Sequence, residues 1–256
     1  MISAIASILR FTCRTVLFIA FLLLILFPTL MLVNVHRRRG TKEGDLKADE
    51  IGARLSSRLV WFFGIRVQVR GAPAEAPVLI AANHISWLDI PVLHTARAMG
   101  FVSKAEVERW PVFSYIARTG GTIFHHRGSH DSASDVANSM IQRLKQGRCV
   151  AIFPEGGIKP GQSIRVFHAR MFRAAVDAEC DVQPVMLRYM RNGHRDDDVG
   201  FREGESMLVN FARMLAQPHA LADINFLPQM DATGQPRRIL ADSARAAVIK
   251  SYESDQ

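Results

Sequence analysis

Cysteine is scarce in this sequence, and its scarcity excludes two ways of holding a fold together. The 256 residues contain three cysteines, Cys13, Cys149 and Cys180. Three scattered thiols are too few for a disulfide framework or a zinc site. Each lies in or beside an apolar segment, so we expect all three to be small buried residues. Nothing near them in the sequence would lower a thiol pKa, which argues against a cysteine nucleophile.

Two common signatures of catalytic sites are also missing. No G-x-S-x-G motif occurs, so the elbow that carries the nucleophile of many serine hydrolases is absent. His125, His126 and His130 lie close together, but Gly128 interrupts any helix that would bring His126 and His130 onto one face. No carboxylate or cysteine completes a ligand set, so we expect no metal site.

Basic residues are in excess only near the N-terminus. Residues 1–70 hold 11 Lys and Arg against 4 Asp and Glu, whereas residues 71–256 hold 21 against 20. A nucleic-acid-binding protein more often spreads its basic residues over a folded surface. Here they flank an apolar segment, which favours contact with anionic lipid headgroups and argues against nucleic acid as a partner.

What the sequence does contain is a long apolar run. Residues 16–33 are 18 uncharged residues, close to the ~20 that cross a hydrocarbon core. A secretory signal peptide has a shorter apolar region that ends at a small-residue cleavage site, so we predict an uncleaved membrane helix. The semi-apolar residues 2–11 leave two other arrangements open, an interfacial helix or a re-entrant pair kinked at Pro28.

The charges around this run predict its orientation. Arg37 to Arg39 and Lys42 outnumber Arg10 and Arg14, so the positive-inside bias puts the bulk of the chain on the cytoplasmic side, at the inner membrane if the protein is bacterial. We expect a membrane anchor over residues 1–39, a polar linker over 40–50 and one folded domain over 51–256.

Beyond the linker, strand patterns alternate with helix patterns, which is typical of an α/β domain. Residues 78–82 and 149–153 are apolar throughout, as expected of strands that helices cover on both faces. We predict a single domain with a central, mostly parallel or mixed sheet flanked by helices. Pro184 predicts an edge position or a bulge for its strand, because proline cannot donate to a ladder. The expected strands are 66–70, 78–82, 101–103, 120–124, 149–153, 182–189 and 224–227, and the expected helices are 51–63, 90–99, 106–118, 131–146, 166–178, 207–215 and 238–252.

Three polar clusters follow predicted strands, where ligands gather in α/β folds. They are His84 to Asp89, Arg127, and Glu155 to Lys159. An imidazole with a nearby carboxylate suits general-base chemistry, since the carboxylate can fix the tautomer while the other nitrogen accepts a proton.

The His-x4-Asp spacing is not specific on its own. It occurs three times, as His84/Asp89, His126/Asp131 and His130/Asp135. The first pair is the one that follows a buried strand, which favours it as the chemical pair. On spacing alone, a satisfied surface pair remains an alternative.

These residues resemble the motifs of the lysophospholipid and glycerolipid acyltransferases, typified by 1-acylglycerol-3-phosphate O-acyltransferase. The resemblance runs from about residue 66 to about residue 189, with a weaker tail to about residue 227. Four motif blocks occur in the family's order, which is far more specific than any one block. The first, N-H-x-S-x-x-D, is present in full as Asn83, His84, Ser86 and Asp89.

The other three blocks match less completely. The second, a lysine followed by a G-T-I-F-x-x-R-like stretch, is matched by Lys104 and residues 121–127, with His125-His126 in place of the usual apolar-acidic pair. The third, F-P-E-G-T-R or F-P-E-G-T-T, holds through Gly156, but Gly157 and Ile158 replace its last two residues. The fourth, V-x-P-V-x-x-x-Y, is matched by Val182, Pro184, Val185 and Tyr189.

The resemblance implies transfer of a fatty acyl group from a thioester of coenzyme A or acyl carrier protein to the hydroxyl of a lysolipid. The leading acceptor is 1-acylglycerol-3-phosphate, which would give phosphatidic acid, and no cofactor is implied beyond the acyl donor as co-substrate. His84 would be the general base, and Asp89 would orient its ring and stabilise the imidazolium. Main-chain N–H groups near Glu155 and Gly157 would stabilise the tetrahedral oxyanion.

The resemblance also implies residues that bind the substrate. Arg127 would hold an anionic headgroup through a forked pair, and Glu155 would position a hydroxyl or hold Arg127. Lys159 would replace the arginine that is missing at Ile158. Lys104 and Gly156 belong to the matched blocks and complete the predicted substrate-binding residues.

The departures in the third block leave the acceptor open. A lyso-ornithine lipid and lysophosphatidylglycerol remain alternatives to 1-acylglycerol-3-phosphate. A non-catalytic membrane protein that binds lipid is the alternative from another class. The expected partners are therefore membrane lipids, the lysolipid and the acyl donor.

Overall fold

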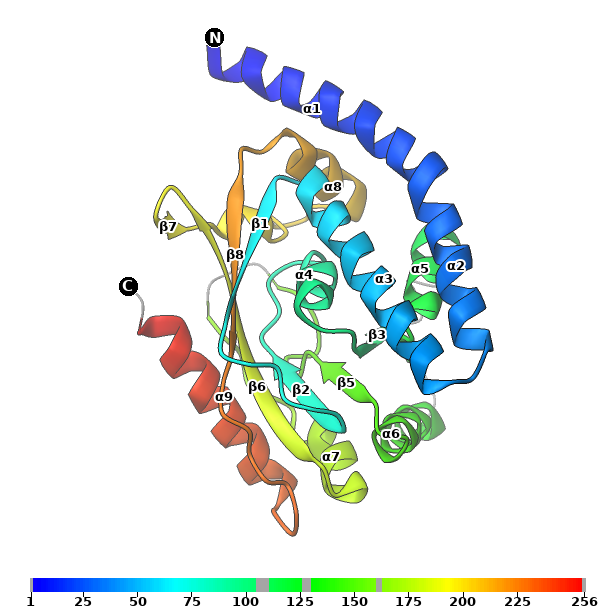
Figure 1. Cartoon of the computed structure of the whole chain (residues 1–256). Coiled ribbons are helices and arrows are strands. Elements are labelled where there is room, and N and C mark those ends of the chain that lie inside the picture. Colours follow the sequence, from blue (N-terminus) through cyan, green and yellow to red (C-terminus); the bar gives the residue numbers. More distant parts are fainter. Residues whose placement is uncertain (1, 105–110, 126–129, 160–162, 255–256) are drawn as a thin grey trace.

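The computed structural model describes residues 2–104, 111–125, 130–159 and 163–254. Eight strands of the described chain form one sheet in the order β1-β8-β6-β2-β5-β3-β4, with β7 paired to β6 (Figure 1). The β6–β8 and β6–β7 pairs are antiparallel and the other pairs are parallel, so the prediction of a mixed, mostly parallel sheet is confirmed. The strands are β1 (Ile65–Arg70), β2 (Val78–Ala82), β3 (Gly100–Lys104), β4 (Ile123–His125), β5 (Cys149–Ile152), β6 (Asp181–Arg191), β7 (His194–Arg195) and β8 (Ala220–Phe226).

Helices cover both faces of this sheet. The apolar cluster on one face includes residues of α3 (Lys42–Phe62), α4 (Asp89–Ala96) and α8 (Met207–Ala216). The cluster on the other face includes residues of α6 (His130–Lys145), α7 (Arg173–Ala178) and α9 (Arg237–Glu253). Every residue of β2 and β5 is buried, which is the reason why these two strands are apolar throughout.

The N-terminal apolar segment forms one long bent helix. It consists of α1 (Ile2–Phe21), a π-helical turn at Leu22–Leu26 and α2 (Phe27–Arg38), and it arcs around one side of the domain (Figure 1). Pro28 has no N–H and its ring crowds the carbonyl four residues earlier, so the wider π-helical turn just before it accommodates the bend. Among the described residues, this is the one helix long and apolar enough to cross a membrane.

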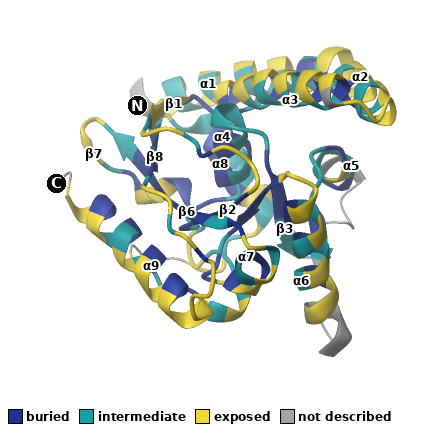
Figure 2. Cartoon of the chain, turned by 60° about the horizontal axis from the view of Figure 1, so that its bottom comes forward, coloured by how far each residue is buried: buried dark blue, intermediate teal, exposed yellow. Residues whose placement is uncertain are grey.

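This helix packs against the folded domain at both ends. Near its start, Arg14 donates to the carbonyl oxygens of Leu215 and Gln217 at 3.2 and 2.7 Å, at the C-terminal end of α8. Near its end, Arg37 pairs with Asp49 of α3 at 2.8 Å. The face turned to the domain is buried, whereas large apolar side chains are exposed along the outer face (Figure 2). Those more than 60% exposed are Ile8, Val16, Leu23, Leu24 and Met31.

Residues 42–50, expected as part of a polar linker, are instead the first half of α3. The Thr41 side chain accepts the N–H of Gly44, and the carboxylates of Glu43 and Asp45 in the first turn favour helix formation there. The outer face of this part of α3 is exposed and therefore polar. For that reason its composition resembles that of a linker.

The expectation that Pro184 marks an edge strand is wrong, whereas the alternative of a bulge agrees with a one-residue shift of the pairing beside it, from Val182 opposite Met230 to Val185 opposite Phe226. The strand of Pro184, β6, lies inside the sheet between β2 and β8. The β8 ladder pairs with residues Val185–Met190, so Pro184 lies just outside it and accepts the N–H of Leu227 through its carbonyl. On the side of β8, Pro184 therefore takes part through its carbonyl oxygen, and no N–H group is needed there.

Two further expectations are corrected. The helix expected over 166–178 starts later, with a 3-10 turn at Ala169–Phe172 followed by α7, because the N–H of His168 donates to the carbonyl of Pro154 in another loop. Cys149 and Cys180 are buried as expected, but Cys13 is exposed on the N-terminal helix.

α5 (Pro111–Thr119) follows the undescribed residues 105–110 and contacts α2. The short 3-10 turn at Asp197–Val199 follows β7 and begins the loop that reaches the candidate site.

Candidate active site

The first motif block begins where the buried strand β2 ends. Asn83 is 1% exposed, and its side-chain amide donates to the carbonyl of Leu187 at 2.9 Å while its side-chain oxygen accepts the Leu187 N–H at 2.7 Å. This side chain makes the two bonds that a continuing strand would make with β6. The backbone is thereby free to turn away from the sheet at His84.

His84 and Asp89 form a direct pair. His84 Nδ1 lies 2.8 Å from Asp89 Oδ2, which also accepts the N–H groups of Ile85 at 2.7 Å and Ser86 at 3.0 Å. The other carboxylate oxygen accepts the hydroxyl of Tyr189 at 2.8 Å. Asp89 is fully buried, so these donors hold its charge in a fixed position. With Nδ1 directed to Asp89, Nε2 is the nitrogen that can accept a proton from a substrate.

The His84 ring is also held by packing. It stacks on Phe153 with the ring centroids 3.8 Å apart and the planes 9° from parallel. Phe153 in turn stacks on Phe101 at 5.7 Å. The phenylalanine of the third motif block therefore fixes the plane of the imidazole.

Glu155 joins the third motif block to the first. It is 5% exposed; its Oε1 accepts the main-chain N–H of His84 at 2.9 Å, and its Oε2 accepts the N–H of Arg165 at 2.9 Å. The Arg165 side chain also pairs with Glu155 at 3.5 Å and donates to the carbonyl of Gly157. Glu155 thus supports the loop that carries His84.

The two glycines after Glu155 have backbone conformations that disfavour a side chain. Their φ angles are 79° at Gly156 and 137° at Gly157. A β-branched threonine, usual in the family at the second position, would be strained at φ 137°. Glycine at position 157 therefore suits the turn that this chain makes.

A cavity of about 130 Å³ opens beside His84. Charged side chains of both signs line it, including those of Glu155, Lys159, Arg165 and Asp197. Its remaining lining includes Asn83, Ile85, Gly200, Phe201 and Tyr252. The histidine–carboxylate pair therefore faces a space that also offers cations to an anionic group.

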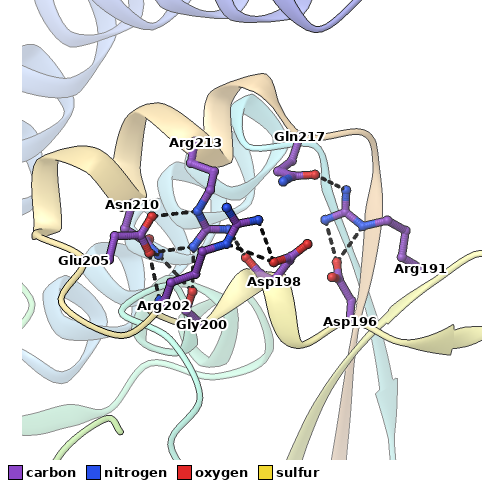
Figure 3. Close-up of polar contacts among 9 residues, drawn as sticks. All are labelled: Arg191, Asp196, Asp198, Gly200, Arg202, Glu205, Asn210, Arg213 and Gln217. Atoms are coloured by element: carbon purple, nitrogen blue, oxygen red, sulfur yellow. Dashed lines mark hydrogen bonds and ion pairs between the residues drawn. The ribbon is translucent and has the colours of Figure 1, made fainter. Parts of the chain in front are cut away.

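The loop on the far side of the cavity is anchored to α8 (Figure 3). Glu205 accepts two bonds of 2.7 Å from Arg213, and Asn210 and Arg213 both donate to the carbonyl of Gly200, at 3.0 and 2.8 Å. The Arg213 bond, more than any other contact, lowers the pKa of Glu205 to about 2. This network fixes the position of Gly200 at the cavity wall.

Asn210 links the same network to the loop that carries His84. It is fully buried, and its side-chain oxygen accepts the indole N–H of Trp87 at 2.8 Å. Gly200 lies so close to this loop that a Cβ on it would be 3.1 Å from the carbonyl oxygen of Ile85. The His84 loop and the cavity wall therefore form one packed unit.

The structure brings together several residues that the sequence singled out. His84, Glu155 and Lys159 line one cavity, Asp89 lies directly behind His84, and Gly156 forms the turn next to Glu155. Lys159 lines the cavity, whereas Ile158 is not part of the described lining.

Other predicted residues lie outside the described part of the chain. These are Arg127, His126 and the side chains of Lys104, His125, His130 and Asp131. The backbone of Lys104 ends β3. The structure therefore gives no geometry for the predicted headgroup contact of Arg127.

Sequence reasoning missed Arg165, Asn210 and the contact that Tyr189 makes. Tyr189 carried a signal, because it closes the fourth motif block. Arg165 and Asn210 carried none: Arg165 donates its main-chain N–H to Glu155, and the Asn210 side chain contacts Trp87, which is distant in sequence. For the thiols, burial raises the pKa of both Cys149 and Cys180 to about 11, which agrees with their expected lack of nucleophilic character.

The chain is similar in sequence to lipid-modifying enzymes. The sequence model of the Acyltransferase family matches residues 65–188. A lyso-ornithine lipid O-acyltransferase of Pseudomonas aeruginosa is 36% identical over 192 residues, which make up 75% of this chain and 74% of that protein. A 1-acyl-sn-glycerol-3-phosphate acyltransferase of Neisseria gonorrhoeae is 37% identical over 122 residues, or 46% of this chain and 48% of that protein.

The fold is also similar to a solved structure. The 1-acyl-sn-glycerophosphate (LPA) acyltransferase of Thermotoga maritima superposes with a TM-score of 0.74, covering 98% of both chains at 17% sequence identity. At that identity the likeness concerns the fold. It extends over the N-terminal helix as well as the α/β domain.

Proposed function

The chain belongs to the acyltransferase family, and we propose that within this family it acylates the hydroxyl of a lyso-ornithine lipid, with His84 as general base. That it is a lysolipid or glycerolipid acyltransferase follows from the family and from the relatives named above. The acceptor, the donor and the role of His84 are the parts that we propose.

The observation that carries the mechanism is the His84–Asp89 pair at the wall of a cavity. The acceptor hydroxyl attacks the thioester carbonyl of acyl-CoA or acyl carrier protein as His84 Nε2 takes its proton. Asp89 stabilises the imidazolium that forms. Main-chain N–H groups of the loop from Glu155 to Gly157 stabilise the oxyanion. When the C–S bond breaks, the imidazolium returns the proton to the departing thiolate, so an ester and a free thiol are formed.

Mixed charge in the cavity supports an acceptor that is itself zwitterionic. An ornithine headgroup carries a carboxylate and an ammonium group. Lys159 and Arg165 can pair with the carboxylate, and Asp197 with the ammonium. The similarity to the lyso-ornithine lipid enzyme also extends over three quarters of the chain.

The sequence alone had favoured 1-acylglycerol-3-phosphate, and this acceptor remains the second candidate. The matching Neisseria gonorrhoeae enzyme supports it over a shorter stretch. Against it stands Ile158, where the family usually has arginine.

Incubating membranes that contain the protein with a labelled acyl donor and a panel of lysolipids tests both candidates, with products identified by mass. We expect acylated lyso-ornithine lipid as the main product; phosphatidic acid as the main product would favour the second candidate. His84→Ala should lower the rate by roughly 10²- to 10⁴-fold, the usual contribution of a general base. His194→Ala, an exposed histidine on β7, is the matched control, and full activity in His84→Ala would refute the mechanism.

The N-terminal helix suggests how the enzyme meets its lipid. Because Arg14 and Arg37 both contact the same domain, we propose that the helix lies along one membrane surface with its outer apolar face in the lipid, not across the bilayer. This replaces the predicted spanning anchor with the interfacial arrangement. The folded domain would still lie on the cytoplasmic side.

Cysteines introduced one at a time at Ser3 and Arg39, in a Cys13→Ser background whose other cysteines, Cys149 and Cys180, are buried, test the orientation of the helix. With a membrane-impermeant maleimide, we expect both positions to be labelled from the same side of sealed vesicles. Labelling of the two positions from opposite sides would instead support a helix that crosses the bilayer.

A further inference from the structure

Residues 163–168 form an irregular segment that ends where the 3-10 turn before α7 begins. Ser163, Ile164 and Arg165 of this segment line the cavity beside His84. Main-chain carbonyls outside helices and strands need donors from elsewhere when they are turned away from water. The group that binds these carbonyls therefore decides the shape of one cavity wall.

The donors come from Arg245, a half-buried side chain of α9. Its Nε donates to the carbonyl of Arg165 at 2.8 Å, and its Nη2 donates to the carbonyl of Ile164 at 2.9 Å. Because both donors belong to one rigid and always charged plane, they fix the two peptide groups on either side of Arg165 together. A lysine has one nitrogen on a flexible stem and could not hold both peptide groups in the same way.

The helix that carries this arginine is a rigid base. Ala241, Ala244 and Val248 on the inner face of α9 are at most 1% exposed. They belong to the same buried apolar cluster as Ile164 and Phe167 of the irregular segment. The guanidinium group therefore ties the segment to an element whose own position is fixed by the core.

The peptide group between Ile164 and Arg165 connects this helix to His84. Its carbonyl accepts from Arg245, and its N–H donates to Oε2 of Glu155 at 2.9 Å. The other carboxylate oxygen of Glu155 accepts the main-chain N–H of His84 at 2.9 Å. A charged donor at the carbonyl polarises the peptide group and strengthens the bond that its N–H makes. The guanidinium group of α9 thus supports the carboxylate that holds the His84 loop.

We propose that Arg245 is a positioning residue of the active site, which holds the cavity wall at residues 164–165 and, through Glu155, the loop of His84. The inference rests on the proposed function, in which His84 is the general base and the cavity receives the acceptor. α9 lies outside residues 65–188, which the family model matches, and none of the four motif blocks includes it. Part of the support of the site therefore comes from a helix beyond the matched stretch.

Arg245→Ala tests the proposal through steady-state kinetics with donor and acceptor varied separately. We expect kcat to fall about tenfold and the acceptor KM to rise about tenfold, each equal to about 1.4 kcal/mol. The donor KM should stay the same, because the fork holds the wall that faces the acceptor headgroup.

Arg245→Lys keeps the charge and most of the stem, and it serves in place of Arg245→Ala if that variant does not fold. It should recover only part of the loss, since one ammonium group replaces two fixed donors. Full activity in Arg245→Lys would assign the effect to charge alone and overturn the role of the fork.

Two variants of the same helix are matched controls. Arg238→Ala removes a positive charge from the exposed start of α9 and should leave all constants unchanged. Ser251→Ala removes a bond of 2.9 Å between α9 and Asn225 of β8, so it should lower the Tm without changing kcat or the acceptor KM. If Ser251→Ala changes both constants as much as Arg245→Ala does, Arg245 only stabilises α9 and the proposal is overturned.

Amide hydrogen exchange over residues 163–168, followed by mass spectrometry, gives a measurement that does not depend on activity. The N–H groups of Arg165 and His168 are hydrogen-bonded in this segment, so it should exchange slowly in the wild type and faster in Arg245→Ala. Unchanged exchange in Arg245→Ala, or unchanged kcat and acceptor KM, overturns the proposal. If the wild type acylates no lysolipid, the proposed function fails, and exchange alone then decides whether Arg245 holds the segment.

Discussion

The hydroxyl of Tyr189 donates to Oδ1 of Asp89 at 2.8 Å, in a part of the core where both side chains are buried. Burial, and secondly the charge of Asp89, raise the pKa of Tyr189 well above its ordinary value. Tyr189 therefore stays protonated and acts as a permanent donor. The last residue of the fourth motif block thus orients the carboxylate of the first.

Replacing Tyr189 by phenylalanine should slow catalysis without weakening substrate binding. A hydrogen bond to a charged group contributes about 1.5–3 kcal/mol, so we expect kcat to fall by roughly ten- to a hundredfold. The KM values for donor and acceptor should stay the same, because Tyr189 lies behind Asp89, away from the cavity. Steady-state kinetics with both substrates varied checks this.

Tyr115→Phe is the matched control, since its hydroxyl accepts a bond from Asn34 far from His84. It should leave kcat unchanged. A rise in acceptor KM in Tyr189→Phe, at unchanged kcat, would show that Tyr189 supports the cavity and does not position Asp89.

Lys159 is expected to bind the acceptor headgroup. It lines the cavity of His84, and the neighbouring Ile158 carries no charge. Lys159→Ala should raise the acceptor KM about tenfold, the effect of losing about 1.4 kcal/mol of binding, while the donor KM changes little. Lys145→Ala, an exposed lysine at the end of α6, controls for the change in charge. Equal increases in both KM values would remove Lys159 from the acceptor site.

The general position of the site could be predicted from the sequence. Buried strands such as 78–82 are apolar throughout, and polar motifs that follow them must lie at one edge of a parallel sheet. From the sequence alone, that argument predicts that His84, Glu155 and Lys159 lie close together. The resemblance to a known family then supplied the roles.

The supports of the site could not be predicted in the same way. Arg165 contributes its main-chain N–H to Glu155, and any residue other than proline has that group. Asn210 is buried, whereas the two residues before it in α8, Leu208 and Val209, are exposed. The apolar pattern of this helix therefore gives no sign that a polar residue at position 210 faces the core. The acidic start of α3 also could not be predicted as a helix, because its contacts with α2 include ion pairs of Arg37 with Asp45 and Asp49, which leave no apolar periodicity in the sequence.

Asn210 offers a test of the link between α8 and the loop that carries His84. Asn210→Ala removes the acceptor of the Trp87 indole and a donor to the Gly200 carbonyl. We expect a loss of about 1–3 kcal/mol in the free energy of unfolding, the cost of leaving buried polar groups without partners. The acceptor KM should rise as well, since Gly200 and Phe201 line the cavity.

Denaturant unfolding and acceptor kinetics measure the two effects of Asn210→Ala. Asn225→Ala, which removes a bond to Ser251 between β8 and α9, is the matched control. It should destabilise the fold and leave the acceptor KM unchanged. If Asn210→Ala behaves in the same way as the control, the cavity wall does not depend on the α8 network.

His94 should make the stability of the fold depend on pH. Its ring packs against Phe101, with the centroids 5.1 Å apart, and burial together with nearby Arg37 lowers the pKa of His94 from 6.5 to about 4. The unfolded chain therefore takes up a proton at a pH where the folded protein does not. The contribution of neutral His94 is complete above about pH 6.5 and is lost progressively as the pH falls toward 4, by up to about 3 kcal/mol.

Thermal unfolding of the purified protein from about pH 7.5 to about pH 4 measures this contribution. Other groups titrate in the same window, so the informative quantity is the difference between the wild type and His94→Asn. The Tm of the wild type should fall more steeply on acidification than that of His94→Asn, whereas His194→Asn, at an exposed position, should follow the wild type. Parallel curves for all three proteins would mean that His94 is protonated as easily in the fold as in the unfolded chain, and that burial of its ring and the charge of Arg37 do not lower its pKa.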